Sequence, residues 1–470
     1  KTVVYWRYKG LSGQAGPGFI GLRDVLAKGR EYEAQHPQIF ADNVTAGSAD
    51  DICSIIYTSG VSGPPKATLH TYRSLMADSA PFVEGEGLTA KDDIVSYLPP
   101  AWITEQWLGF GCHLLSGGTV NFAENAETQR EDVREIAPSV VVYNGRLWES
   151  EAGEVLAKIQ SASWLKRRST SWAMPIGLRA ADSYHAQRQL PWHWRALNQI
   201  ADWVVFRALR DQLGLPHARV CYTSGSVLSP ETTRFFHALK VPLKSVYGSS
   251  EGGAVTGAAK GGQNPGTVGR VNPGVEVRLT EQSEIEVRHP GTFLGDEGNA
   301  AGVVGRGDDG WVPTGDLGEL TPEGDLVFVD RLQDLIELPC GDVVPPQLIE
   351  SRLRSSPYIK DAWVHAEQGC DRLSAVIIVD PGNVGHWADK AKVAFTTFGD
   401  LSQKTEVYEL IGREIQKVNG ALPETRRIHR YVNLHKEFDP DEYELTRNRK
   451  LRRFYVKERY AGLARALSGR

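Results

Sequence analysis

The stretch YTSGVSGPPKAT, residues 57–68, gathers two glycines, several hydroxyl residues and one lysine within a dozen positions. Glycines let backbone N–H groups converge on an anion, hydroxyls add donors, and Lys66 adds a compact cation suited to phosphate. The run is not a Walker A loop, because two prolines separate Gly63 from Lys66 and alanine follows the lysine. Alone, it fits either a phosphate-binding loop or a surface turn.

Three further stretches carry side chains that could act on a nucleotide. In SVYGSSEGG, residues 245–253, the ring of Tyr247 could stack on a planar base, and Glu251 offers the hard oxygen that Mg²⁺ prefers. Asp316 in WVPTGDLGEL could accept hydrogen bonds from a sugar diol. Lys450 lies in the cationic stretch LTRNRKLRRFYV near the C-terminus. Taken singly, these stretches also fit plain turns and a solvated basic tail.

The composition is that of an ordinary globular protein with two or three cores. The chain has 470 residues, of which 41% are hydrophobic and 24% charged, and its net charge of −5 argues against nucleic acid as a partner. Five widely spaced cysteines show no ligand spacing, which indicates reduced thiols and a cytoplasmic location. No apolar run is long enough to span a bilayer.

The elements that must hold these residues follow from periodicity. Residues 21–35 predict an amphipathic helix, and 51–60 predict a buried strand that enters the glycine loop. Between 90 and 145, short apolar runs alternate with helical stretches, which is typical of an α/β domain with a largely parallel sheet. Residues 318–330 predict a hairpin around a Thr-Pro-Glu-Gly turn. We expect a boundary near Arg331 and a small α+β domain after it.

Residues 160–215 interleave five tryptophans with arginines. Leu197, Ile200, Val204 and Ala208 recur at helical spacing, and we expect this stripe to pack on a core with the arginines in solvent. The alternative is a surface that faces a membrane.

Together these pieces resemble the adenylate-forming superfamily of acyl-CoA synthetases, luciferases and peptide-synthetase adenylation domains. YTSGVSGPPKAT resembles its phosphate loop, YGSSEG its Tyr-Gly-x-Thr-Glu element, PTGD its ribose element, and DRLQDLIELPCGDVVPPQLIE its hinge region. The segments ending in RLWE and LTRNRKLRRF are most similar to the long-chain fatty acyl-CoA synthetase branch. The residues that depart from the family pattern are Val61, Ala67, Trp102, Ser250, Gln333 and Glu337.

The resemblance implies the fold: an α/β chain with a large multi-layer N-terminal adenylation domain at 1–330, a hinge at 331–334 and a mobile α+β C-terminal domain at 335–470. The family has a substantial subdomain before the phosphate loop, and only 56 residues precede that loop here. We therefore expect that the N-terminal subdomain is either absent from this sequence or lost.

The resemblance also implies the roles of individual residues. Lys450 and Glu251 would be catalytic, with Glu251 holding Mg²⁺, Gln333 the hinge, Gly341 the contact for coenzyme A, and Trp102 part of the acyl pocket. The implied ATP-binding residues are Thr58, Ser59, Gly60, Ser62, Gly63, Lys66, Gly225, Ser226, Tyr247, Gly248, Ser249, Ser250, Asp316 and Arg331.

The implied activity is that of an AMP-forming fatty acid–CoA ligase, with ATP, Mg²⁺, coenzyme A and a long-chain fatty acid as its small molecules. The alternatives are another carboxylic acid, a carrier protein as acyl acceptor, or a relative that binds nucleotide without catalysis. Oligomerisation and peripheral contact with a membrane stay open.

Overall fold

A computed structural model describes residues 2–6, 18–58, 67–125, 127–258, 263–289, 310–367, 369–446 and 449–468. The chain forms two compact units, Lys1–Asp51 and Ile52–Arg470. Among the described residues, no helix combines the length and the apolar character needed to cross a membrane.

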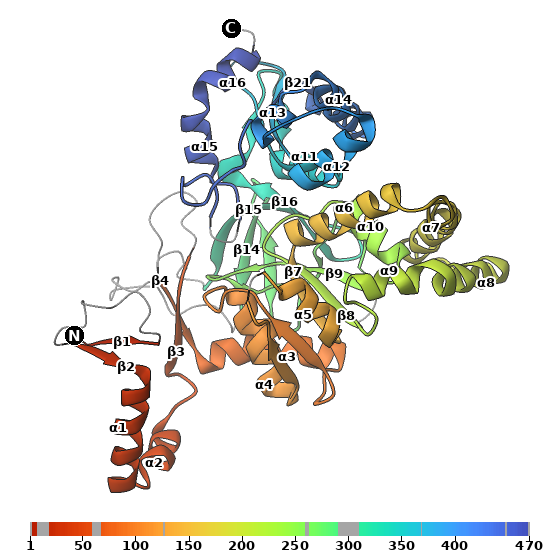
Figure 1. Cartoon of the computed structure of the whole chain (residues 1–470). Helices are drawn as coiled ribbons and strands as arrows, with labels where there is room; N and C mark the ends of the chain where they lie inside the picture. The colour runs from red at the N-terminus through yellow and green to blue at the C-terminus, as the bar shows by residue number, and fades with distance from the viewer. Residues whose placement is uncertain are drawn as a thin grey trace. The chain divides into compact units, whose positions relative to one another are not determined.

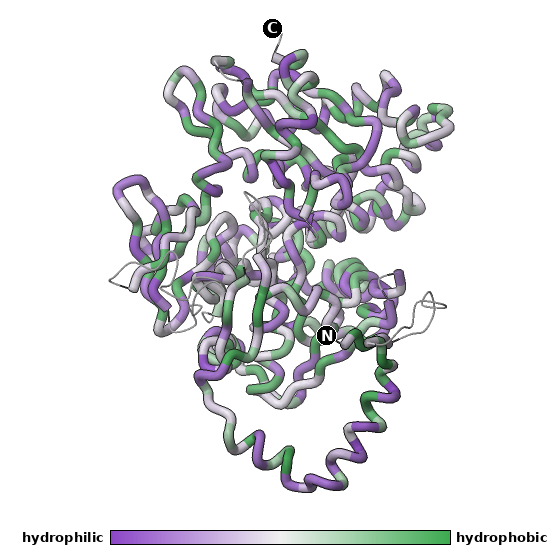
Figure 2. Tube along the Cα trace, turned by 90° about the vertical axis from the view of Figure 1, so that its left-hand side faces the viewer, coloured by the Kyte–Doolittle hydropathy of each residue, from purple (hydrophilic) through white to green (hydrophobic). Residues whose placement is uncertain are grey.

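The first unit is small and has little interior. Strand β1 (Val3–Tyr5) pairs in parallel with β2 (Phe19–Gly21), and helices α1 (Leu22–Gln35) and α2 (Ile39–Ala46) follow. The predicted helix at 21–35 is therefore confirmed. Neither helix has a buried residue, and Figure 2 shows hydrophilic and hydrophobic positions mixed along both.

A five-stranded parallel sheet forms the centre of the second unit, as the alternation of apolar runs predicted (Figure 1). Its strands, in spatial order, are β6 (Thr119–Phe122), β5 (Asp93–Ser96), β7 (Val140–Asn144), β8 (Val220–Ser224) and β9 (Leu243–Val246). The helices that accompany these strands are α3 (Tyr72–Glu86), α4 (Cys112–Ser116), α5 (Gln129–Ile136), α6 (Gly145–Ser161) and α10 (Pro230–Ala238), with a π-helical segment at Glu105–Gly111.

Helices cover both faces of this sheet because its strands alternate their side chains. In β7, Val141 belongs to a core with Trp148 of α6, whereas Val142 belongs to a core with Phe82 of α3 and Trp107. Apolar residues on both faces are typical of a parallel sheet buried between helical layers. The predicted α/β fold class is confirmed by this arrangement.

The strand expected at 51–60 is present but is mostly not buried. Strand β3 (Ile52–Tyr57) pairs antiparallel with β4 (Ala67–Thr71), and in β3 only Ile56 is buried. The expectation of a buried strand is wrong because β3 belongs to a two-stranded sheet, which leaves most of its side chains in contact with solvent.

A second sheet, of five antiparallel strands, contains the hairpin predicted at 318–330. Strands β15 (Val312–Leu320) and β16 (Asp325–Arg331) are joined by a tight turn in which Gly324 has a φ of +85°. The other strands are β12 (Gly269–Arg270), β13 (Glu276–Leu279) and β14 (Glu284–Arg288), and a separate short pair is β10 (Gly248–Ser249) with β11 (Gly253–Ala254).

The C-terminal part builds its own core on a three-stranded sheet. Ala375 and Ile377 of the middle strand pack in one apolar cluster, and Val376 and Ile378 pack in another. The strands are β19 (Ile359–His365), β20 (Leu373–Val379) and β21 (Ile428–Asn433), with β17 (Ile336–Glu337) and β18 (Val343–Val344) before them. The helices are α11 (Pro346–Arg354), α12 (Pro381–Ala391), α13 (Phe398–Ser402), α14 (Thr405–Gly420), α15 (Arg453–Arg459) and α16 (Ala461–Ser468), with 3₁₀ turns at Leu332–Asp334 and Glu424–Arg426. The domain boundary near Arg331 stays a prediction.

The tryptophan-rich stretch forms two helical segments in succession, and the second is continuous from Trp192 to Gln212. Helix α7 (Trp164–His185) is followed by α8 (Trp192–Ala201), a π-helical segment (Asp202–Phe206) and α9 (Arg207–Gln212). The expected core stripe is wrong: Ile200, Val204 and Ala208 are exposed, and Leu197 is half-buried. The core side is instead formed by Ala201, Val205 and Phe206.

Candidate active site

The centre of the candidate site is a buried aspartate on β15. Asp316 is 4% exposed, and the hydroxyl of Tyr247 donates a hydrogen bond to its Oδ2 at 2.8 Å. Asp316 pairs with Arg331 across the β15–β16 ladder, and the Arg331 Nε lies 3.4 Å from Asp316 Oδ1. The hairpin register thus places a carboxylate, a phenol and a guanidinium together, although they are far apart in the sequence.

Lys450 joins this cluster from the C-terminal part of the chain. A tight loop presents it: the Lys450 carbonyl accepts from the Thr446 N–H at 2.8 Å, and its own N–H donates to Thr446 Oγ1 at 2.9 Å. Burial and the nearby Arg331 lower the pKa of Lys450 to about 8, while Asp316 and Glu251 act in the opposite direction. Two predicted catalytic residues and two predicted ATP-binding residues therefore lie within electrostatic reach of one another.

Asp316 has spare capacity to bind a ligand. Burial raises the pKa of its carboxyl, and Arg331, Tyr247 and Lys450 oppose that rise. Its Oδ1 is buried and faces Arg331 as an ion pair, but it accepts no hydrogen bond within the described part of the chain. A buried acceptor without a hydrogen bond is costly, and a diol could supply the missing hydrogen bonds.

Glu251 follows β10 in a turn that Ser249 stabilises by accepting a hydrogen bond from the Gly252 N–H at 2.8 Å. The Glu251 side chain makes no hydrogen bond or ion pair with the described residues. Within the same residues, no group of three or more His, Cys, Asp or Glu could hold a metal. Mg²⁺ commonly uses one carboxylate together with substrate phosphates and water, so the lone Glu251 carboxylate fits this ion.

The ring of Tyr247 is largely enclosed. It is 7% exposed, lies 5.7 Å from the ring of Phe328, and packs in a core with Val255 and Leu326. Its predicted stacking on adenine stays a prediction. Gly248 approaches the neighbouring backbone so closely that a Cβ there would meet the Gly253 carbonyl at 2.4 Å. Ser250 lies in the turn that follows Ser249.

The phosphate loop is only partly placed. Thr58 directly follows β3, and Ser59, Gly60, Ser62, Gly63 and Lys66 lie outside the described residues. Their role in holding phosphate, and the meeting of Lys66 with Lys450 at one nucleotide, stay predictions.

Gly225 and Trp102 lie against each other at the end of strand β8. Gly225 has a φ of +77°, and a Cβ at this position would meet Trp102 Cζ2 at 2.5 Å. Next to them, Ser226 Oγ accepts a hydrogen bond from the Gly145 N–H at 3.1 Å. The positive φ and the close ring both require glycine here. The structure therefore brings together the residues predicted to line adenine and the acyl pocket.

The predicted hinge and coenzyme A residues lie on exposed turns. Gln333 is exposed in the 3₁₀ turn that directly follows β16. Gly341, with a φ of +85°, lies in the loop between β17 and β18, where its N–H donates to the Leu338 carbonyl. Their roles stay predictions.

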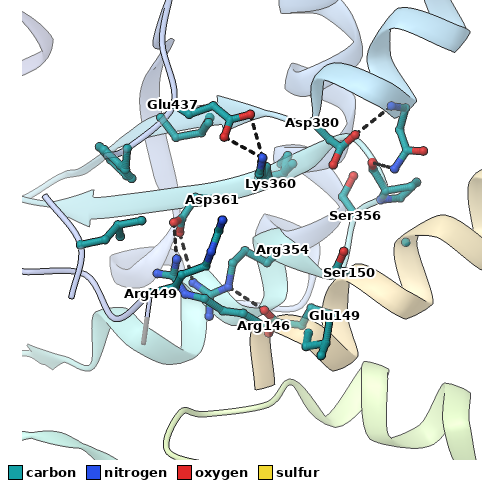
Figure 3. A pocket seen from close by; sticks show the side chains of 18 of the residues that line it. Arg146, Glu149, Ser150, Arg354, Ser356, Lys360, Asp361, Asp380, Glu437 and Arg449 are labelled. Carbon is teal, nitrogen blue, oxygen red and sulfur yellow. Dashed lines mark hydrogen bonds and ion pairs between the residues drawn. The ribbon is translucent and has the colours of Figure 1, made fainter. Parts of the chain in front are cut away.

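A network of buried charges was missed by the sequence reasoning. Around a cavity of about 400 Å³, Arg354 donates to Glu149 at 2.6 Å and Arg146 to Asp361 at 2.5 Å (Figure 3). Ser351 also donates to Glu149 at 2.6 Å. The RLWE segment contains Arg146 and Glu149, but its pattern alone indicates no buried network. The network joins α6 to α11 and β19.

A family profile described as AMP-binding enzyme matches residues 20–295, more than half of the chain. The chain belongs to this family, and the resemblance to adenylate-forming enzymes is confirmed. Long-chain-fatty-acid–CoA ligase 1 of Schizosaccharomyces pombe is 27% identical over 93% of this chain and 66% of its own length. Long-chain-fatty-acid–CoA ligase FadD15 of Mycobacterium bovis is 26% identical over 95% and 74%. These names agree with the predicted fatty acyl-CoA synthetase branch.

Solved structures show the same fold. The A domain of carboxylic acid reductase from Segniliparus rugosus, in complex with AMP and a co-purified carboxylic acid, matches with a TM-score of 0.67 and 19% identity over 96% of this chain and 66% of that one. ATP-bound MatB from Rhodopseudomonas palustris matches with a TM-score of 0.59 and 18% identity, over 89% and 70%.

Proposed function

We propose that this protein activates a long-chain fatty acid with ATP and then transfers the acyl group to coenzyme A. The observation that carries the proposal is that Lys450, from the C-terminal part, lies within electrostatic reach of Asp316, which accepts a hydrogen bond from Tyr247. Family membership and the names of the fatty acid–CoA ligase relatives support the reaction class.

In the first half-reaction, an oxygen of the fatty carboxylate attacks the α-phosphorus of ATP, and the bond to pyrophosphate breaks. The obstacle is the approach of one anion to another, so positioning and charge neutralisation are what the protein must supply. Asp316 would hold the ribose hydroxyls, with Arg331 supporting it. The Lys450 ammonium would bridge the carboxylate and the α-phosphate. Mg²⁺, held at Glu251, would offset the charge of the leaving pyrophosphate.

In the second half-reaction, the thiol of coenzyme A attacks the acyl carbonyl and AMP leaves. Lys450 would obstruct the thiol if it stayed in place. We propose that the C-terminal part rotates about Gln333, which withdraws Lys450 and brings the loop around Gly341 toward the pantetheine arm.

The substrate class is tested by pyrophosphate release across a panel of carboxylic acids of increasing chain length, with aryl acids included. We expect release with long-chain fatty acids and formation of the thioester when coenzyme A is added. If release is faster with an aryl or short-chain acid, that acid class would replace long-chain fatty acids as the proposed substrate. Nucleotide binding without acid-dependent release would show a non-catalytic relative.

The role of Lys450 is tested by Lys450→Ala in the two half-reactions measured separately. We expect adenylation to fall by a factor on the order of 10²–10³, the usual cost of losing an oriented charge. Thioester formation from preformed acyl-adenylate should be retained. Equal loss in both half-reactions would contradict the assigned role.

A further inference from the structure

The helical pair formed by α7 and α8 exposes an unusual number of tryptophans. Trp164, Trp192 and Trp203 are exposed by 69%, 79% and 74%. The pair extends outward beside the large sheet (Figure 1), and its inner side is already packed through Ala173, Ile176 and neighbouring residues. The exposed tryptophan rings therefore lie outside the part of the helical pair that packs against the core.

On α8 and the π-helical segment after it, the exposed apolar residues share one side. Trp192, Ile200, Trp203 and Val204 are all exposed, at separations close to whole helical turns. On α7, Leu165 and Trp172 line a shallow hollow together with Arg168. Clustered exposed apolar residues of this kind mark a docking surface rather than ordinary surface variation.

The same helices are strongly basic, although the chain as a whole is acidic. Residues 161–212 contain eight lysines and arginines against three aspartates, whereas the whole chain has a net charge of −5. All three aspartates have arginine partners: Asp182 with Arg234, Asp202 with Arg210, and Asp211 with Arg134. Among the described residues, no carboxylate pairs with the remaining basic residues of this segment, which are Lys166, Arg167, Arg168, Arg179, Arg188, Arg195 and Arg207, and the Arg179 guanidinium lies over the ring of Trp194.

We propose that the α7–α8 helical pair docks on a bilayer surface that contains anionic phospholipid. Tryptophan prefers the boundary between water and acyl chains, and unpaired arginine and lysine bind anionic headgroups. Protein interfaces are also enriched in tryptophan and arginine, so a protein partner is the alternative occupant, and failure to bind anionic vesicles would favour it over the bilayer. The inference does not depend on the proposed reaction.

The test is co-sedimentation of the full chain with vesicles of phosphatidylcholine alone and with vesicles that also contain phosphatidylglycerol. We expect binding to the anionic vesicles that weakens as salt is added. Trp192→Ser combined with Trp203→Ser, and separately Arg167→Glu combined with Arg168→Glu, should each weaken binding about tenfold. A blue shift of tryptophan emission on binding should be lost in the tryptophan variant.

Matched controls come from the first unit. Trp6 is 81% exposed, and Arg23 and Arg30 are exposed on α1. Trp6→Ser and the pair Arg23→Glu with Arg30→Glu should bind like the wild type, and circular dichroism should show every variant folded. Failure to bind anionic vesicles, equal binding to neutral vesicles, or insensitivity to the α7 and α8 variants would overturn the proposal.

Discussion

At the scale of single residues, the protonation of Lys450 decides how the site can work. Burial and the proximity of Arg331 disfavour the ammonium form, and the pKa of Lys450 is lowered to about 8. Below that pH the side chain is a cation able to neutralise the carboxylate and phosphate, and above it the side chain becomes a neutral amine. We therefore expect the kcat/KM of adenylation, which reports the free enzyme, to fall as pH rises through about 8.

The measurement is acid-dependent pyrophosphate release between neutral and alkaline pH. Arginine stays charged throughout this range, so Lys450→Arg should be less active but should lose the alkaline fall. A wild-type profile that stays flat well above pH 8 would show that the ammonium of Lys450 is not required in the free enzyme.

The sequence predicted the residues of the candidate site better than it predicted their surroundings. Tyr247, Asp316, Arg331 and Lys450 were predicted as site residues, and the structure places them together. Each of these residues has a side chain that can bind part of a nucleotide, and each lies within a short sequence motif. The enclosure of the Tyr247 ring could not be predicted, because it depends on the packing of Phe328 and Val255 from other segments.

At the scale of elements, a buried ion pair links α6 to α11. Glu149 and Arg354 are 2% and 8% exposed, and they are bonded at 2.6 Å. Removing one partner leaves the other charge buried without compensation, which typically costs about 3–5 kcal/mol. We expect Glu149→Leu or Arg354→Met alone to lower the free energy of unfolding by about that amount in denaturant titrations. The double variant should recover most of the loss, and additive losses would show that the two charges do not act as a pair.

The sequence could not predict this ion pair, because its partners are 205 residues apart and share no local pattern.

The core-facing side of α8 could not be predicted for a different reason. Two apolar stripes were available, one through Leu197 and Ile200 and another through Ala201 and Val205. A π-helical segment at Asp202–Phe206 changes the rotation per residue that a regular helix would have. Periodicity alone therefore assigned the wrong side to the core.

At the scale of the whole molecule, the proposed rotation must break every contact between α6 and the C-terminal part. One of these contacts is neutral and can be removed without stranding a charge: the hydroxyl of Tyr358 donates to Gln160 Oε1 of α6 at 2.6 Å. A hydrogen bond of this kind contributes about 1 kcal/mol net, which corresponds to a change of about fivefold in an equilibrium.

Tyr358→Phe should therefore shift the balance away from the arrangement that presents Lys450 to the nucleotide. We expect the rate of adenylation, relative to that of thioester formation from preformed acyl-adenylate, to fall by up to about fivefold. Tyr431→Phe is the matched control, because its hydroxyl donates to the Tyr408 carbonyl at 2.7 Å entirely within the C-terminal part. That control should leave the ratio unchanged. If Tyr358→Phe slows both half-reactions equally, the contact contributes to stability but does not bias a rotation, and the hinge at Gln333 loses its support.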